Sequence, residues 1–596
     1  MRYRSGMRTN RRSVLAGLAS ASGIAALPKG ARARPAGLSQ PDLGPNVIIL
    51  TPDMPTQSAQ ARLDGIFARQ ERSHFSDDRY AVLLMPGEHA LDINVGFFTQ
   101  VAGVGRMPGD VVVRGHVHAE ADWNDGVALV NFWRSAENMA VRPPDGADRW
   151  AVSQAAPYRR MDIAGDLFLD DGGWSSGGFI ADSVISGTVR SGTQQQWFTR
   201  NSTIGGWDGS NWNMMFMGVE GAPPTMFPDP PYTTIEDVPV VRDKPFLQVT
   251  PSGVWQVLKP ALRRNARGPG WANGSQAGEA IALDDFLIAT PDMPAGRINA
   301  ALASGKHLLL TPGIYRLTEP LEVVRPGTVV LGLGLATLLA EGGTVAMRIA
   351  DVSGVVIAGL LFDAGPQVSP LLLQVGPPGA SADNRDDPIS LSDIFVRVGG
   401  ARNGRVETAV EVNSNHVIGD HLWIWRADHG DRAGGREHVG WDENTANQGL
   451  IVNGDDVVLS GLFVEHFQKY QTLWNGERGR TYFYQNELPY DPPSQADYMA
   501  DGRRGYAAYK VADHVDHHLA VGMGIYANFT ADPSIVLESA IQAPEKPDVR
   551  FRSVTTISLG GGKGTIAHIV NDSGEAAKKG AVRQTLNEYP PRGAMK

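Results

Sequence analysis

The five residues TPDMP occur twice in this chain, at 51–55 and at 290–294, and similar segments follow each copy. After each copy comes a stretch with the spacing of an amphipathic helix. A short apolar strand ending in Pro-Gly follows, YAVLLMPG at 80–87 and HLLLTPG at 307–313. Further on, Trp207 and Glu220 match Trp474 and Glu487 at one constant offset. Ordered self-similarity of this kind predicts one architecture used twice.

Each half is dominated by apolar runs of three to six residues with Gly, Asn and Asp between them, as in AMRIADVSGVVIAGLLFDAG at 346–365. The 69 Gly and 39 Pro residues suit many short strands joined by turns. Strands that recur roughly every 20–25 residues are typical of a solenoid. We therefore expect an all-β fold of two tandem right-handed parallel β-helices, similar to pectate lyases, with short capping helices. A pair of β-sandwiches is the alternative.

The expected boundaries follow from composition. Residues 34–262 form the first β-helix, 263–280 a Gly/Asn/Arg-rich linker, 281–570 the second β-helix with the catalytic residues, and 571–596 a C-terminal tail. Residues 1–33 have paired Arg11 and Arg12, an apolar run and a small-residue Ala-x-Ala site. That layout indicates a twin-arginine export signal, hence a secreted or periplasmic protein. The run is too short and too rich in small residues for a membrane anchor.

Charge and cysteine content narrow the function classes. With 54 basic and 64 acidic residues the net charge is −10, and there is no basic stripe of the kind that binds nucleic acid. The chain has no cysteine, so disulfides and thiolate metal sites are excluded. The His- and Asp-containing segments 421–449 and 511–518 lack fixed metal-ligand spacing. We expect no metal and no cofactor.

Two glutamates, Glu465 and Glu487, lie 22 positions apart in an aromatic and amide-rich segment. In a solenoid that interval is one coil, and neighbouring strands are about 4.8 Å apart, so the carboxyls would stack. Two carboxyls this close cannot both ionise freely, and one keeps its proton near neutrality. Hydrolysis of a glycosidic bond needs such an acid together with a partner for water. The alternative is that both glutamates lie on the solvent-exposed surface, each in an ion pair with a nearby basic residue.

Side chains near the pair are candidates for binding sugar hydroxyls or stacking on sugar rings. From the segment itself these are Gln471, Trp474, Tyr484, Gln485 and Tyr490. The segment 421–449 adds Trp441 and Asp442, with Asp442 or Glu443 as a reserve candidate for the base. The first half has Phe198 where Glu465 has its counterpart, so no second pair is expected. The polar segments 166–183 and 191–202 are either solvated turns or part of a cleft wall.

The stretches FVEHFQKYQ, YFYQNELPYDPP and GMGIYANFT resemble the catalytic part of glycoside hydrolase family 55, the tandem β-helix β-1,3-glucanases. The resemblance implies that Glu487 is the general acid and that Glu465 helps to arrange the nucleophilic water. It also implies inversion at the anomeric carbon without metal or organic cofactor. Val464 and Asn486 replace hydroxyl residues of the family pattern, and TPDMP replaces its usual opening motif, which leaves room for a different substrate.

The leading expectation is an exported, monomeric glycoside hydrolase that cleaves a β-glucan, β-1,3-linked, with a polysaccharide or oligosaccharide as its only partner. Two alternatives remain open. A polysaccharide lyase would need a Lys or Arg base and usually Ca²⁺. A non-catalytic carbohydrate-binding solenoid would use the same aromatic and amide residues without the acid.

Overall fold

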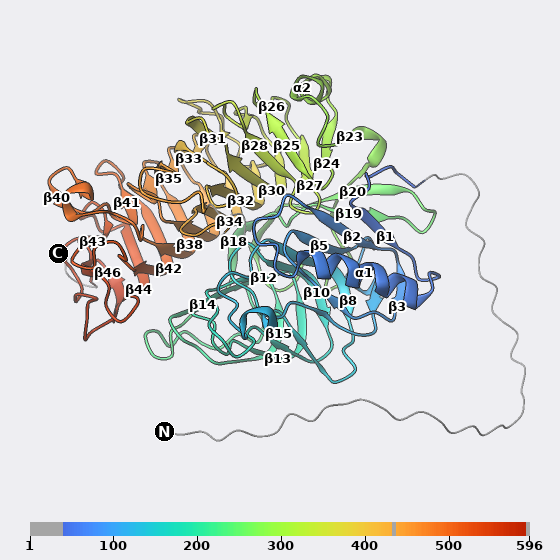
Figure 1. Ribbon diagram of the computed structural model, residues 1–596, viewed down its shortest axis with the longest axis horizontal. Helices are drawn as coiled ribbons and strands as arrows, with labels where there is room; N and C mark the ends of the chain where they lie inside the picture. The colour runs from blue at the N-terminus through green and yellow to red at the C-terminus, as the bar shows by residue number, and fades with distance from the viewer. Residues whose placement is uncertain (1–39, 432–436, 592–596) are drawn as a thin grey trace, which may run out of the picture. The chain divides into compact units, whose positions relative to one another are not determined.

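The computed structural model describes residues 40–431 and 437–591, and the expected export signal at 1–33 lies outside these ranges. The short apolar runs form strands because aliphatic and β-branched side chains fit a pleated, buried surface. Gly, Asn and Asp turns separate them. Most of the strands pair in parallel with strands one coil away in sequence (Figure 1).

The first half forms an N-terminal stack (β1–β17) around a 15-stranded parallel sheet. The main path of this sheet is β1 (Val47–Leu50), β2 (Tyr80–Leu84), β5 (Thr99–Gly103), β8 (Arg134–Val141), β10 (Pro157–Ile163), β12 (Phe179–Ala181), β14 (Gln196–Arg200), β16 (Asn213–Met217) and β17 (Tyr232–Ile235). Its remaining strands are β3 (Gly87–His89), β6 (Val111–Val113), β9 (Ala147–Arg149), β11 (Asp166–Phe168), β13 (Val184–Arg190) and β15 (Thr203–Asp208), and a small separate sheet pairs β4 (Ile93–Asn94) with β7 (Val117–His118).

The second half forms a C-terminal stack (β23–β46) with two large sheets, between which successive strands alternate. The 13-stranded sheet contains β23 (Phe286–Ala289), β24 (His307–Leu310), β25 (Ile314–Leu317), β27 (Val329–Gly332), β28 (Thr337–Ala340), β30 (Val356–Ala364), β32 (Ser390–Val398), β34 (Ile418–Arg426), β36 (Val458–Glu465), β38 (Gly479–Glu487), β42 (His518–Ala527), β44 (Val549–Ser558) and β46 (Arg583–Tyr589). The 9-stranded sheet contains β26 (Leu321–Val323), β29 (Met347–Ile349), β31 (Ser369–Val375), β33 (Val406–Val412), β35 (Ala446–Val452), β37 (Thr472–Trp474), β41 (Tyr509–Val511), β43 (Val536–Gln542) and β45 (Thr565–Val570), and a small hairpin pairs β39 (Met499–Ala500) with β40 (Arg503–Arg504).

The long strands of the 13-stranded sheet share a left-handed residue at one level of the stack. These residues have φ between 51° and 71° and are Gly359, Asp393, His421, Gly461, Phe483, Gly522 and Ser553. The extra residue acts like a bulge, so the alternation between inward and outward side chains shifts by one there. In β36, Leu459 and Leu462 both face the C-terminal core, three positions apart. The residues that follow the bulge therefore face the other way from what strict alternation predicts.

The helices predicted after each TPDMP are present as α1 (Thr56–Gln70) and α2 (Ala295–Ser304), each beginning directly after the proline. The stretch expected as a linker at 263–280 holds β21 (Arg263–Ala266) and the start of β22 (Gly278–Ala282). β21 pairs antiparallel with β18 (Val238–Val241), and β22 pairs antiparallel with β20 (Trp255–Pro260), which in turn pairs with β19 (Phe246–Val249). We call β18–β22 the connecting segment. The expected tail likewise contains β46, which pairs antiparallel with β44.

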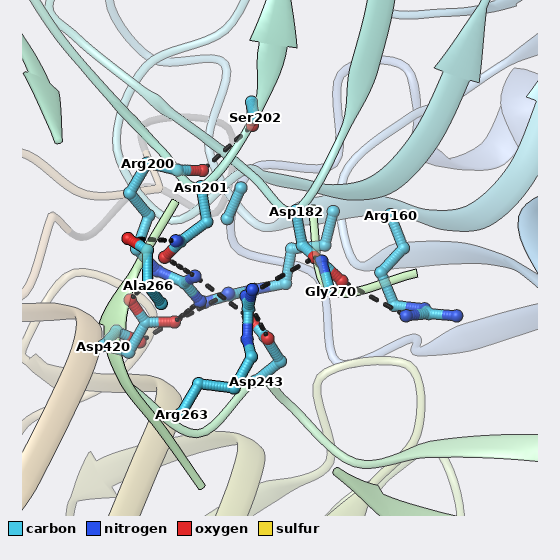
Figure 2. Close-up of polar contacts among 12 residues, drawn as sticks. Arg160, Asp182, Arg200, Asn201, Ser202, Asp243, Arg263, Ala266, Gly270 and Asp420 are labelled. Carbon is cyan, nitrogen blue, oxygen red and sulfur yellow. Dashed lines mark hydrogen bonds and ion pairs between the residues drawn. The ribbon is translucent and has the colours of Figure 1, made fainter. Parts of the chain in front are cut away.

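Each stack has its own aliphatic core, and a third cluster, mainly aromatic, joins residues of both stacks, among them Trp133, Phe198, Trp423 and Phe483. A chain of buried ion pairs runs alongside this cluster. Arg200 binds Asp420 at 2.6 Å and Asp243 at 2.9 Å, and Arg263 of the connecting segment binds Asp243 at 2.9 Å (Figure 2). Removing one residue of this series of ion pairs would leave a buried charge without its partner. The ion pairs therefore fix how the two stacks contact each other.

Candidate active site

The two glutamates lie at the ends of neighbouring parallel strands. In the ladder between β36 and β38, Phe463 pairs with Gln485, and continuing the same register places Glu465 opposite Glu487. The backbone N–H of His466 donates to the carbonyl oxygen of Glu487 at 2.8 Å, which extends the ladder to this level. The vertical pair predicted from the interval of one coil is therefore present in the strand register.

Glu465 is held by donors from both stacks. Its side chain is buried, with 3% of the residue surface exposed. Gln154 of the N-terminal stack donates from Nε2 to Oε1 at 3.0 Å, and Trp423 of β34 donates from Nε1 to Oε2 at 2.8 Å. The hydroxyl of Ser176 donates to Oε1 of Gln154 at 3.0 Å, so the amide of Gln154 must present its N–H₂ to Glu465.

Glu487 is half-buried and has a different partner, the Tyr490 hydroxyl, which donates to Oε2. The ring of Tyr490 meets that of His466 edge to face at 4.5 Å between centroids. Asp428 lies 3.6 Å from Nε2 of His466, on the side of β34. Opposite Glu487 in the register of the next strand is Tyr526, whose hydroxyl donates to Oε1 of Gln196 at 3.0 Å.

The two carboxyls differ in the causes that raise their pKa values. Burial raises the pKa of Glu465 to about 8, although the donors Trp423, Gln485 and Gln154 oppose that rise. Burial, and then repulsion from Glu465 and Asp428, raises the pKa of Glu487 well above its usual range. Amide and indole donors stabilise a carboxylate. The carboxyl of Glu465 therefore ionises first, and Glu487 keeps its proton.

The comparisons with known proteins agree with this geometry. The model of the LAM55 pectate lyase-like domain matches residues 286–487, a range that includes both glutamates. An exo-beta-1,3-glucanase from Streptomyces sp. (strain SirexAA-E / ActE) is 50% identical over 538 residues, which is 90% of this chain and 87% of the relative. The chain belongs to glycoside hydrolase family 55.

Solved structures of the same relative also match this family 55 protein. The structure of sacteLam55A from Streptomyces sp. SirexAA-E has a TM-score of 0.90 and 48% sequence identity, covering 92% of this chain and 99% of that chain. A glutamate-to-alanine variant of sacteLam55A in complex with glucose matches with the same TM-score of 0.90 and the same 48% identity.

Three of the residues predicted to bind substrate are instead part of the C-terminal stack's interior. Trp474 and Tyr484 are fully buried in its core, where Tyr484 donates to the carbonyl of Ala508 at 2.8 Å. Gln471 is also fully buried, and its amide binds the backbone N–H and C=O of Phe467 at 2.8 and 2.6 Å. These predictions were wrong, because such side chains have no exposed surface for a sugar to contact.

The other predicted residues divide into two groups. Gln485 and Tyr490 lie beside the glutamates, as described above. Trp441 is half-buried under the guanidinium of Arg426, at 5.9 Å from the ring centroid, and Arg426 in turn binds Asp491 next to Tyr490. Asp442 is exposed, and no described contact joins it to either glutamate.

Sequence reasoning missed several residues of the site. Asp428 and Trp423 belong to the segment 421–449 that was singled out, but no role distinguished them there. Ser176 and Gln196 belong to the two polar segments of the first half, which confirms that parts of these segments are more than solvated turns. Their neighbour Trp197 is fully buried, whereas Trp174 is 57% exposed. Gln154 had no local signal at all, because its partner is 311 positions later.

In residues 40–431 and 437–591, no group of three or more His, Asp or Glu side chains is arranged to hold a metal ion. No helix in the same ranges is long and apolar enough to cross a membrane.

Proposed function

We propose that this protein hydrolyses β-1,3-glucan, with Glu487 as the general acid and Glu465 as the carboxylate that activates water. The observation that carries the proposal is the unequal environment of the two stacked glutamates. Burial disfavours the charged form of both carboxyls, but Glu465 accepts hydrogen bonds from Gln154 and Trp423, whereas Glu487 has one donor, Tyr490, and is further disfavoured as an anion by repulsion from Glu465. The exo-beta-1,3-glucanase relative supports the substrate class.

In the proposed reaction the proton of Glu487 passes to the glycosidic oxygen while the bond from that oxygen to the anomeric carbon breaks. A water molecule attacks the anomeric carbon from the opposite side and gives its proton to ionised Glu465. A general acid of raised pKa supplies this proton at neutral pH, where an ordinary glutamate would be ionised.

The geometry favours inversion over retention. Inverting enzymes hold their carboxyls about 6.5–9.5 Å apart so that a water molecule fits, and retaining enzymes about 5–5.5 Å apart. Here each carboxyl is drawn toward its own partners, Glu465 toward Gln154 and Trp423, and Glu487 toward Tyr490. Because the two carboxyls have different partners, we propose that they lie far enough apart to hold a water molecule between them.

Substrate binding is proposed for the residues around the pair that keep exposed surface. Tyr490 and Trp441 are half-buried and Trp174 is exposed, so their rings are available to stack on sugar rings. The glucose complex of the relative's glutamate-to-alanine variant supports a sugar site of this kind. We further propose that each stack is a right-handed parallel β-helix and that the protein is a monomer.

Product analysis tests the function directly. The purified protein is incubated with a panel of glucans that includes laminarin, and the products are separated by chromatography and followed by proton NMR. Hydrolysis of laminarin alone, with the product released first as the α-anomer, supports the proposal. A product with ultraviolet absorbance would identify a lyase, and binding without any product would identify a non-catalytic solenoid.

Export is a separate proposal that rests on Arg11 and Arg12, the apolar run that follows and the Ala-x-Ala site. Fusing residues 1–40 to a reporter that is active only after export tests it. Replacement of both arginines by lysine should abolish export, since the twin-arginine pair identifies the signal.

A further inference from the structure

A basic groove lies far from the glutamates, where the connecting segment meets the C-terminal stack. Its volume is about 520 Å³. Charged side chains dominate its lining: Arg264, Arg385, His416, Asp456, Arg478 and Arg480. Together the four guanidinium groups contact three carboxylates, namely Asp456 of the lining, Asp455 beside Arg478, and Asp383 at 3.9 Å from Arg385 and 3.1 Å from His416. The groove therefore keeps a small excess of positive charge, although the chain as a whole has a net charge of −10.

One wall is built from three successive turns of the C-terminal stack. His416 and Asp456 each precede a strand by two residues and Arg478 precedes one directly, and all three have positive φ values of 56–61°. Arg478 donates from Nε to Asp456 at 2.9 Å and from Nη2 to Asp455 at 3.1 Å. Arg478 is thus shared between two carboxylates, and the groups available to a bound anion are the other arginines of the lining.

Two arginines of the lining have no acidic partner among the described residues. Arg480 is the second residue of β38, pairs with Val458 in the strand register, and is exposed. Arg264 belongs to β21 of the connecting segment and is also exposed. Its Nη2 donates to the carbonyl oxygen of Arg385 at 2.5 Å, which fixes the guanidinium at the groove and leaves its other N–H groups available.

We propose that this groove binds a small oxyanion, phosphate or sulfate, either free or carried on a sugar. Planar guanidinium groups bind such oxyanions through two parallel hydrogen bonds. The volume also fits a sugar-sized ligand. Arg480 and Glu487 are seven residues apart on one strand, about 23 Å at the rise of an extended chain, so the groove is separate from the glutamate pair.

Isothermal titration at constant ionic strength tests the proposal with three probes: inorganic phosphate, glucose 6-phosphate and glucose. We expect one saturable site for phosphate and none for glucose. Tighter binding of glucose 6-phosphate than of phosphate assigns the site to an anionic sugar, and equal or weaker binding assigns it to the free anion. The absence of saturable binding by either phosphate compound would overturn the proposal.

Variants of the groove arginines test whether phosphate binds at this groove. Arg264→Gln and Arg480→Gln should each weaken phosphate binding by about tenfold or more, the factor expected when one charge-assisted hydrogen bond is lost. Arg62→Gln on α1 removes an exposed arginine outside the groove and should leave the affinity unchanged. Equal affinity in wild type and both groove variants would place the anion elsewhere and refute the assignment. Glucan hydrolysis by these variants should stay at the wild-type rate, which separates this test from that of the proposed function.

Discussion

Gln154 in the N-terminal stack donates a hydrogen bond of 3.0 Å to Oε1 of Glu465 in the C-terminal stack. The donor and acceptor are 311 positions apart, and both are buried. The first half of the chain, which has Phe198 in place of an acid, therefore still helps to set the protonation of the site. The duplication has left one half with the carboxyls and the other with an amide that orients one of them.

Replacing Gln154 by Leu should lower kcat/KM on laminarin by about 10–100-fold, the usual worth of a hydrogen bond to a charged group. The amide stabilises the ionised form of Glu465, so its loss should raise the pKa of Glu465 above about 8. In the proposed mechanism activity requires ionised Glu465, so the acidic limb of the pH–rate profile should move to higher pH. Profiles of kcat/KM for wild type and variant measure both effects.

Ser176→Ala is the matched variant, because Ser176 contacts Gln154 and not Glu465. It keeps Gln154 but frees its amide to rotate, so a smaller loss and a smaller shift of the same limb are expected. An unchanged pH profile in Gln154→Leu, at any level of activity, would contradict the assigned role of this contact.

The parts of the fold that repeat locally were predictable from sequence. Helices α1 and α2, the short strands and the interval between Glu465 and Glu487 follow from spacing within one or two coils. The contacts between the stacks were not predictable, because residues such as Gln154 and Arg159 have partners hundreds of positions away that no local pattern specifies.

The incorrect prediction that Tyr484 binds substrate has a local physical cause. Phe483 has a φ of 61°, a value that nothing in the local sequence YFYQ indicates for a phenylalanine. This left-handed residue shifts the alternation of β38, so Tyr484 faces the C-terminal core while Gln485 and Glu487 face the site. With one residue more or less before Glu487, the carboxyl would be in the core. The register of the catalytic face thus depends on a backbone conformation and not on side-chain pattern.

Glu487→Gln should lower kcat/KM on laminarin by about 10²–10⁴-fold, the usual contribution of a general acid. A glucoside with an acidic aryl leaving group needs no proton, so the loss on that substrate should be much smaller. The unfolding temperature should stay the same or rise, since glutamine resembles the protonated acid that burial favours. Glu220→Gln, at the matching and exposed position of the first half, is the control and should change neither quantity. Equal losses on both substrates would argue against an acid role.

Arg159→Met should lower the free energy of unfolding by about 3–5 kcal/mol, because it removes one of the cations that balance two buried carboxylates. Arg159 binds Asp393 and Asp420 at 2.7 Å each, and all three side chains are at most 3% exposed. The matched control is Arg316→Met. It breaks a 2.8 Å pair with Glu341 that is about half exposed, and it should cost under about 1 kcal/mol. Urea unfolding of both variants gives the comparison, and similar costs for the two would refute the structural importance of the buried network.

His118 should make the protein less stable as the pH becomes alkaline. Burial alone would lower its pKa, but hydrogen bonds to Asp92 and Glu120 outweigh burial and raise the pKa to about 9. The folded-state pKa is above the unfolded value of about 6.5, so the stabilisation is complete below that pH and is lost as the pH rises through about 9. The shift corresponds to about 3 kcal/mol.

We expect His118→Gln to be less stable than wild type at pH 6 and nearly equal to it at pH 10, measured by urea unfolding. His514→Gln, an exposed histidine of the C-terminal stack, should show no such convergence. A constant difference between His118→Gln and wild type across this range would mean that His118 stabilises the fold by packing instead of charge.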